Sequence, residues 1–92
     1  MNEKYLDYIA RLDLKAYEYR ILLLLAVKPY TPTQIVNELG VMKQNVNRYI
    51  QSLKGLGLIE VDRIEGRNKF YKSVTDIKKL KEFLPGQTTM KI

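Results

Sequence analysis

Two helical patterns separated by a tight glycine turn occupy residues 31–55, and few small folds accommodate such a pair. Thr31, Pro32 and Gln34 form a strong helix-start signal, because the threonine hydroxyl caps the first turn, proline suits the first helical position and the glutamine completes a capping box. This helix is short, and Gly40 supplies the positive φ that its exit turn needs. The pattern predicts two consecutive helices joined by a sharp turn, which is a helix-turn-helix.

The second helix of the pair is predicted from Lys43 to residue 54 or 55, with apolar side chains at spacings of four and three. Burial of Val46, Ile50 and Leu53 turns a polar arc outward. The outward side chains are Gln44, Asn45, Asn47, Arg48 and Gln51. Amide side chains pair with adenine and arginine pairs with guanine, each good pair contributing about 1–3 kcal/mol of discrimination. We interpret the arc as base-contacting; the alternative is a merely solvated face, although such faces usually carry carboxylates as well.

Two further helices are predicted before this pair. Residues 2–12 have the apolar spacing of a short amphipathic helix, and residues 14–27 form a longer helix for which Asp13 is the expected N-cap. Residues 21–27 are apolar on every side, so this helix needs to be covered by the rest of the domain and by either the N-terminal helix or a partner chain.

A β-hairpin is predicted after the pair. Two β-prone segments at residues 58–63 and 69–74 flank a charged turn at residues 64–68, which contains glycine and asparagine. The complete pattern predicts a mostly helical α+β fold, the winged helix-turn-helix, with a three-helix core, a two-stranded wing and flanking helices at both ends.

The last predicted helix follows the hairpin, with Thr75 or Asp76 as its cap and Leu80 and Leu84 on its apolar face. Residues 87–92 are expected to form a loose tail. A chain of 92 residues has room for one compact domain, which we place at residues 1–86.

Residues 31–59 resemble the core of winged helix regulators of the MarR and ArsR type. The most specific part is Leu-Lys-Gly-Leu-Gly-Leu-Ile at residues 53–59, where such proteins pass from the recognition helix to the wing. The resemblance implies a dimeric transcription regulator, so we expect a homodimer. Met42 departs from the pattern, because these families commonly have serine or threonine there as helix cap and phosphate ligand.

Charge is unevenly divided along the chain, which has a net charge of +6. Residues 1–42 contain five basic and five acidic side chains, whereas residues 43–92 contain eleven basic and five acidic ones. A surplus confined to one half favours a surface that faces a polyanion; the alternative is a basic protein that binds nothing acidic.

Contacts to DNA phosphates are expected from polar side chains near the helix starts and in the hairpin. They are Thr33, Gln34, Lys43, Lys54, Arg63, Arg67, Asn68 and Lys69. Arg67, at the hairpin tip, is also a candidate for the minor groove, although an arginine in a tight turn is just as often only solvated. Lys78, Lys79 and Lys81 are expected to form only the exposed face of the last helix.

The composition excludes most catalytic chemistry. The chain has no cysteine and no histidine, which removes disulfides, zinc sites and imidazole catalysis, so Ser52 and Ser73 lack a histidine base. We expect no cofactor, no metal and no enzymatic activity. The longest purely apolar run, residues 21–27, is far shorter than the roughly 20 residues that span a membrane, so we expect a cytoplasmic protein.

The predicted function is sequence-specific binding of double-stranded DNA by a transcriptional regulator. The helix at about 43–54 would read the major groove, and the wing at 63–69 would contact the backbone or the minor groove. The alternative is a winged helix module that binds a protein of a replication or transcription complex, which the fold alone does not exclude.

Overall fold

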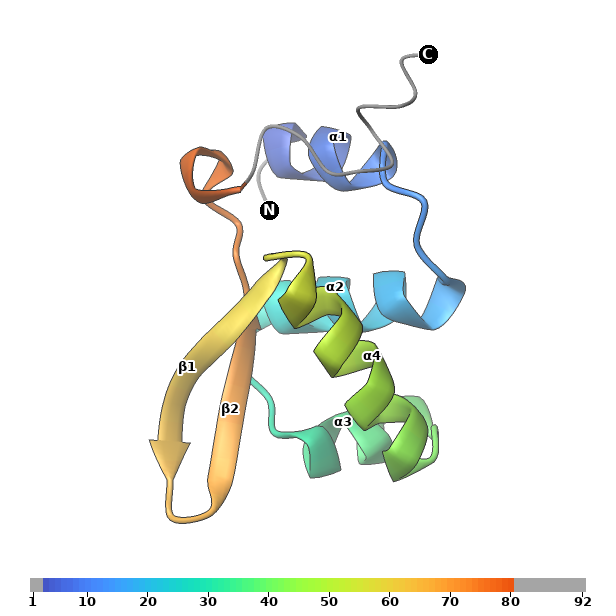
Figure 1. The fold of residues 1–92 in the computed structure, drawn as a ribbon, viewed down its shortest axis with the longest axis vertical. Helices are drawn as coiled ribbons and strands as arrows, with labels where there is room; N and C mark the ends of the chain where they lie inside the picture. The colour runs from blue at the N-terminus through green and yellow to red at the C-terminus, as the bar shows by residue number, and fades with distance from the viewer. Residues whose placement is uncertain (1–2, 81–92) are drawn as a thin grey trace.

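The computed structural model describes residues 3–80 (Figure 1). Its elements are α1 (Glu3–Ala10), α2 (Ala16–Val27), α3 (Pro32–Leu39), α4 (Lys43–Gly55), β1 (Ile59–Glu65), β2 (Asn68–Ser73) and a short 3₁₀ helix, η1 (Ile77–Lys79). Leu84, the predicted tail at residues 87–92 and the remainder of the last predicted helix lie outside the described residues.

Helix α2 begins later than predicted, at Ala16. The backbone N–H of Lys15 donates to Glu18 Oε1 at 2.9 Å, so a glutamate reaching back closes the first turn. The prediction of Asp13 as the N-cap is therefore wrong, because the residue in the cap position is Lys15, with an extended backbone at φ −73 and ψ 155. Glu18 is buried by this arrangement.

Helices α3 and α4 have the predicted bounds and the predicted turn between them. Thr31 Oγ1 accepts from the N–H of Gln34 at 3.2 Å, and Gln34 Oε1 accepts from the N–H of Thr31 at 3.0 Å. Gly40 ends α3 with φ 67, the left-handed conformation that glycine adopts without steric cost. Helix α4 follows almost at once, with Met42 in the cap position and no side-chain hydrogen bond to its first turn.

The hairpin is tighter than predicted. Strands β1 and β2 are antiparallel and remain paired up to Glu65 and Asn68, so the connecting turn contains only Gly66 and Arg67. Gly66 has φ 62, and no residue other than glycine has a positive φ within residues 3–80. Glycine first, followed by a residue with negative φ, is the pattern of a type II′ turn, which matches the twist of the flanking strands.

Two contacts fix the hairpin to the helices. Tyr30, in the α2–α3 connection, forms a β-bridge with Tyr71, with N···O distances of 3.0 and 2.9 Å. The buried Ser73 hydroxyl donates to the carbonyl of Leu22 in α2 at 2.6 Å. Because both contacts involve β2, this strand is held against the helices and the orientation of the wing is set from its base.

A single apolar core joins these elements. Its completely buried side chains come from α1, α2, α3, α4 and the start of the wing: Tyr5, Ile21, Leu22, Leu25, Ile35, Ile50, Leu53, Leu58 and Val46. Helix α2 packs on both α4 and β2, and α1 packs against η1. Figure 1 shows α1 and η1 at one end of the molecule and the hairpin turn at the other, where α3 and the first turns of α4 also lie. The fold is the predicted winged helix-turn-helix, with α2, α3 and α4 as its core and β1–β2 as its wing.

Candidate nucleic-acid interface

Helix α4 turns the predicted polar arc outward. Gln44, Asn47, Arg48 and Gln51 are exposed and Asn45 is half-buried. Val46, Ile50 and Leu53 are buried on the opposite side of the helix. None of the helix's residues is acidic, so its outer surface combines amide groups with positive charge. Such a surface is suited to the hydrogen-bonding edges of bases and to a polyanion.

A shallow hollow lies between the hairpin and the starts of α3 and α4, with a volume of about 170 Å³. We call it the cationic hollow, and its lining residues are Thr31, Pro32, Thr33, Lys43, Arg67, Asn68, Lys69 and Tyr71. The fold thus brings together five predicted phosphate contacts from two segments, residues 33–43 and 67–69, that are more than 20 positions apart in the sequence: Thr33, Lys43, Arg67, Asn68 and Lys69. Three of them are cations, and no carboxylate lines this hollow. Cations and hydrogen-bond donors without a carboxylate give this hollow a lining that is chemically suited to an anion.

Lys54 lies at the other end of α4 from Lys43 and also faces the wing. Its Nζ is 6.0 Å from the centroid of the Tyr71 ring. Tyr71 also lines the cationic hollow, so the Lys54 side chain continues the positive surface from the hollow along α4.

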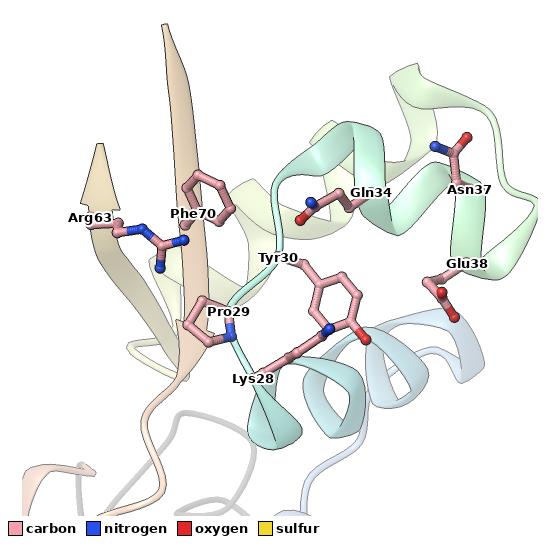
Figure 2. Close-up of a pocket in the computed structure, with 8 residues that line it drawn as sticks. All are labelled: Lys28, Pro29, Tyr30, Gln34, Asn37, Glu38, Arg63 and Phe70. Atoms are coloured by element: carbon pink, nitrogen blue, oxygen red, sulfur yellow. The ribbon is translucent and has the colours of Figure 1, made fainter. Parts of the chain in front are cut away.

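A second and larger hollow, of about 470 Å³, lies between the wing and α3 (Figure 2). We call it the wing–α3 hollow, and its lining residues are Lys28, Pro29, Tyr30, Gln34, Asn37, Glu38, Arg63 and Phe70. Neighbouring residues of a strand point to opposite faces, so Phe70 and Tyr71 place the two hollows on opposite faces of β2. Figure 2 shows Arg63 and Phe70 on the hairpin and Gln34, Asn37 and Glu38 across the hollow on α3.

The guanidinium of Arg63 is engaged within the wing. Its Nε donates to Glu65 Oε2 at 2.7 Å, and its NH1 donates to Asp62 Oδ2 at 3.1 Å. Its Cζ lies 3.9 Å from the centroid of the Phe70 ring. The hydrogen bond to Glu65 raises the pKa of Arg63 above its usual value. Arg63 therefore differs from the other predicted phosphate contacts, because two carboxylates already compensate its charge.

A β-bulge gives Asp62 two cationic neighbours. The register of the hairpin shifts between Val61 and Arg63, which leaves Asp62 without a partner on β2. Its carboxylate contacts Arg63 and also lies 3.6 Å from Lys72 Nζ, which in turn is 3.7 Å from Glu60. The pairs join into one row, which we call the wing ion-pair chain: Glu65, Arg63, Asp62, Lys72 and Glu60.

A protein-family model for the "Sugar-specific transcriptional regulator TrmB" matches residues 9–75. The matched span contains α2, α3, α4 and both strands of the wing. The chain belongs to the TrmB family. TrmB proteins are transcriptional regulators, so the chain is a DNA-binding regulator domain of this kind. The finer resemblance to MarR and ArsR regulators stays a prediction. No curated protein matches the chain.

In this TrmB domain, Gln34, a predicted phosphate contact, also caps the start of α3. Its Oε1 accepts the N–H of Thr31 in the capping box, so the amide nitrogen is the group left to donate outward. The side chain also lines the wing–α3 hollow rather than the cationic hollow. The structure therefore separates Gln34 from Thr33, although the two are adjacent in the sequence.

Sequence reasoning did not place Arg20 of the TrmB domain near α4. Tyr17 stacks on Tyr49 of α4, with ring centroids 6.1 Å apart, and the guanidinium of Arg20 lies 5.0 Å from the Tyr17 centroid. Tyr49 and Lys54 are five residues apart on α4, so they project about 140° apart around its axis. The Tyr17–Tyr49 stack thus lies on the flank of α4 away from the wing, and Arg20 lies against the Tyr17 ring of this stack. The available signal was the i, i+3 spacing of Tyr17 and Arg20 on one helix.

Helix α4 is the longest helix of the described TrmB residues, with 13 residues. Over residues 3–80, no helix combines the length and the apolar character needed to cross a membrane. The same residues contain no cluster of three or more carboxylate, histidine or cysteine side chains that could hold a metal ion.

Proposed function

We propose that this TrmB-family chain is a sequence-specific transcriptional regulator that reads the major groove of double-stranded DNA with α4. The observation that carries the proposal is the outward arc of α4, which is free of carboxylates and lies beside the cationic hollow. Gln44, Asn45 and Arg48 are the first candidates for base contacts, because the N-terminal turns of a recognition helix enter the groove most deeply. Asn47 and Gln51 extend the same arc.

The DNA backbone is proposed to lie on the cationic hollow. Its phosphate ligands would be Thr33, Lys43, Arg67, Asn68 and Lys69, with Lys54 and the Gln34 amide at the margin. Such contacts fix the register of the protein on the duplex and supply most of its affinity, whereas the base contacts of α4 supply the sequence preference. Arg67, in the hairpin turn, is the residue that we propose enters the adjacent minor groove.

A homodimer in the cytoplasm is the form in which we propose that the protein acts, as the resemblance to MarR and ArsR regulators implies. The support from the structure is the outer face of α2, where Leu23 is 39% and Val27 is 72% exposed. Two-fold symmetric regulators bind half-sites about 34 Å apart or a multiple of that distance, so the proposed operator is an inverted repeat.

Titration of the full chain against labelled duplex DNA at several salt concentrations tests the proposal. We expect binding that weakens steeply as salt rises, because each phosphate contact releases about 0.9 counterions. Selection of bound sequences from a random duplex pool then supplies the specific site. Absence of binding at low salt, or binding that is insensitive to salt, would reject the proposal.

The division of labour between α4 and the wing is tested with Arg48→Ala and Lys69→Ala. Loss of Arg48 is expected to lower the preference for the selected sequence about 10- to 100-fold, the ratio that corresponds to one good base contact. Loss of Lys69 should weaken all duplexes about equally and reduce the salt slope by about 0.9. The matched control is Lys78→Ala, a charge loss in η1 at the far end of the molecule (Figure 1). Equal effects of Arg48→Ala and Lys69→Ala on preference would refute the assignment.

A further inference from the structure

We propose that Glu65 determines on which face of the wing the DNA backbone lies. By holding Arg63 in the wing ion-pair chain, Glu65 keeps the wing–α3 hollow from binding phosphates, so that the duplex is directed to the cationic hollow. The proposal rests on the proposed DNA binding and adds a specificity-determining residue that makes no contact with DNA.

The two hollows differ in charge. The cationic hollow is lined by the three cations Lys43, Arg67 and Lys69 and by no carboxylate. The wing–α3 hollow is lined by Lys28 and Arg63 but also by Glu38, and Arg63 is bonded to Asp62 and Glu65. Together with the rest of the wing ion-pair chain, three cations (Lys28, Arg63 and Lys72) stand against four carboxylates (Glu38, Glu60, Asp62 and Glu65), which gives this face a local charge of −1. A phosphate approaching the wing is therefore attracted to one face and repelled from the other.

Glu65 lies where its carboxylate can prevent Arg63 from binding a phosphate. It is the last residue of β1, directly before the Gly66 turn, and it pairs with Asn68 across the hairpin. Its carboxylate bonds Arg63 Nε at 2.7 Å, so it occupies a donor that a phosphate would otherwise use. Because the Glu65 side chain is 59% exposed, a phosphate that approaches Arg63 also meets the charge of this carboxylate.

Phe70 is the third side chain of the wing that contacts the Arg63 guanidinium. Its ring lies under the guanidinium of Arg63 at 3.9 Å, and Arg63 and Phe70 are cross-strand partners. The guanidinium is thus held by two carboxylates and one aromatic face, all supplied by the wing itself. In this arrangement Arg63 is a positioning residue of the wing and the phosphate-binding cations are those of the other face.

Glu65→Gln is the test variant, and Glu60→Gln is its matched control. Both remove one negative charge from β1 with little change in size, but Glu60 bonds Lys72 near the base of the hairpin. At 0.1 M salt the Debye length is about 10 Å, so the charge of Glu60, at the base of the hairpin, is largely screened from a phosphate near Arg63. Released Arg63 supplies one more phosphate contact. We expect Glu65→Gln to bind a non-specific duplex about three- to eightfold more tightly at 0.1 M salt, with a salt slope steeper by about 0.9. Glu60→Gln should change affinity less than about twofold.

The role of Arg63 is tested in the same titrations. Arg63→Gln alone is expected to leave the affinity of the wild-type chain unchanged within about twofold, whereas Lys69→Ala weakens it. Combining Arg63→Gln with Glu65→Gln should abolish the gain, because Arg63 is the group that Glu65→Gln releases; the double-mutant cycle measures this coupling. Far-UV circular dichroism checks that each variant is folded.

Two results would overturn the inference while leaving DNA binding intact. One is an equal gain from Glu65→Gln and Glu60→Gln, which would mean that only total charge matters. The other is a loss of affinity in Arg63→Gln as large as that in Lys69→Ala, which would make Arg63 a direct phosphate ligand. Failure of the wild-type chain to bind duplex DNA at low salt is a different outcome and rejects the proposed function itself.

Discussion

Tyr5 connects α1 to the rest of the molecule through a side chain that is completely buried. Its hydroxyl is the one buried side-chain polar atom without a hydrogen-bond partner among residues 3–80. The nearby Ser73 hydroxyl donates instead to the carbonyl of Leu22. Burial raises the pKa of the Tyr5 phenol, and the proximity of Ser73 partly offsets the rise. Burial of the aromatic ring therefore stabilises the core, whereas burial of the unpaired hydroxyl lowers the free energy of unfolding.

Tyr5→Phe is expected to leave the free energy of unfolding unchanged at neutral pH or to raise it by about 1 kcal/mol, because an unsatisfied buried hydroxyl is removed. A raised pKa in the folded state means that the unfolded chain loses its proton first, so wild-type stability falls as pH rises above about 10. The advantage of the phenylalanine variant should grow over that range. Chemical denaturation at pH 7 and at pH 10.5 measures both effects. A loss of more than about 1 kcal/mol at pH 7 would show that the hydroxyl has a partner.

The two helices of the helix-turn-helix begin in contrasting ways. Helix α3 has a complete capping box between Thr31 and Gln34, with Pro32 at its first position. Helix α4 begins at Lys43, and the residue in its cap position, Met42, makes no side-chain capping hydrogen bond and is 63% exposed. The first N–H groups of α4 are therefore left for water or for a ligand, which agrees with the proposal that this helix N-terminus faces DNA.

Met42→Ser is expected to stabilise the domain by about 1 kcal/mol, because serine supplies the missing cap and little apolar burial is lost. For a domain of this size the melting temperature should rise by about 4–8 °C. Met42→Ala is the control, since it removes the same side chain without adding a cap. Thermal unfolding followed by circular dichroism compares the two. An equal melting temperature for both variants would contradict the assignment of Met42 as an uncapped start.

At the scale of the whole molecule, the fold separates exposed apolar surface from the surface proposed to face DNA. The hairpin turn and the first turns of α4 share one end, and α1 and η1 share the other (Figure 1). Helix α2 was predicted to need covering on every side, and Ile21, Leu22 and Leu25 are indeed buried. Val27 remains exposed on its outer face. With Leu23, it forms the surface on which we propose that a second copy of the chain packs.

Val27→Lys is expected to convert the proposed homodimer into a monomer, because burying an unpaired ammonium at the interface is costly. Sedimentation velocity at micromolar concentration measures the change. Ile64→Lys is the matched control, since Ile64 is an apolar side chain of the wing with a comparable exposure of 61%. The dimer assignment fails if the wild-type chain sediments as a monomer, or if the two variants behave alike.

Local signals in the sequence determined most of the elements. The capping box at Thr31, the turn at Gly40 and the apolar spacing of α4 depend on residues within four positions of one another, so they are readable without the fold. The same holds for the outward arc of α4. The start of α2 was misplaced because Glu18 competes with Asp13 for the role of closing the first turn. The predicted turn of the hairpin, residues 64–68, was too long, because Gly66 and Arg67 alone connect the two strands.

Tertiary structure alone decided which charged side chains act together. Lys43 and Lys69 both line the cationic hollow because the Tyr30–Tyr71 bridge holds the wing beside the helices. The two tyrosines are about 40 positions apart, so their pairing produces no periodic pattern in the sequence. Arg63 looked like Arg67 in the sequence, yet a bulge and a cross-strand ring hold it against two carboxylates. Secondary structure follows from short-range sterics and hydrogen bonds, whereas the surface electrostatics depend on long-range packing that no window of sequence contains.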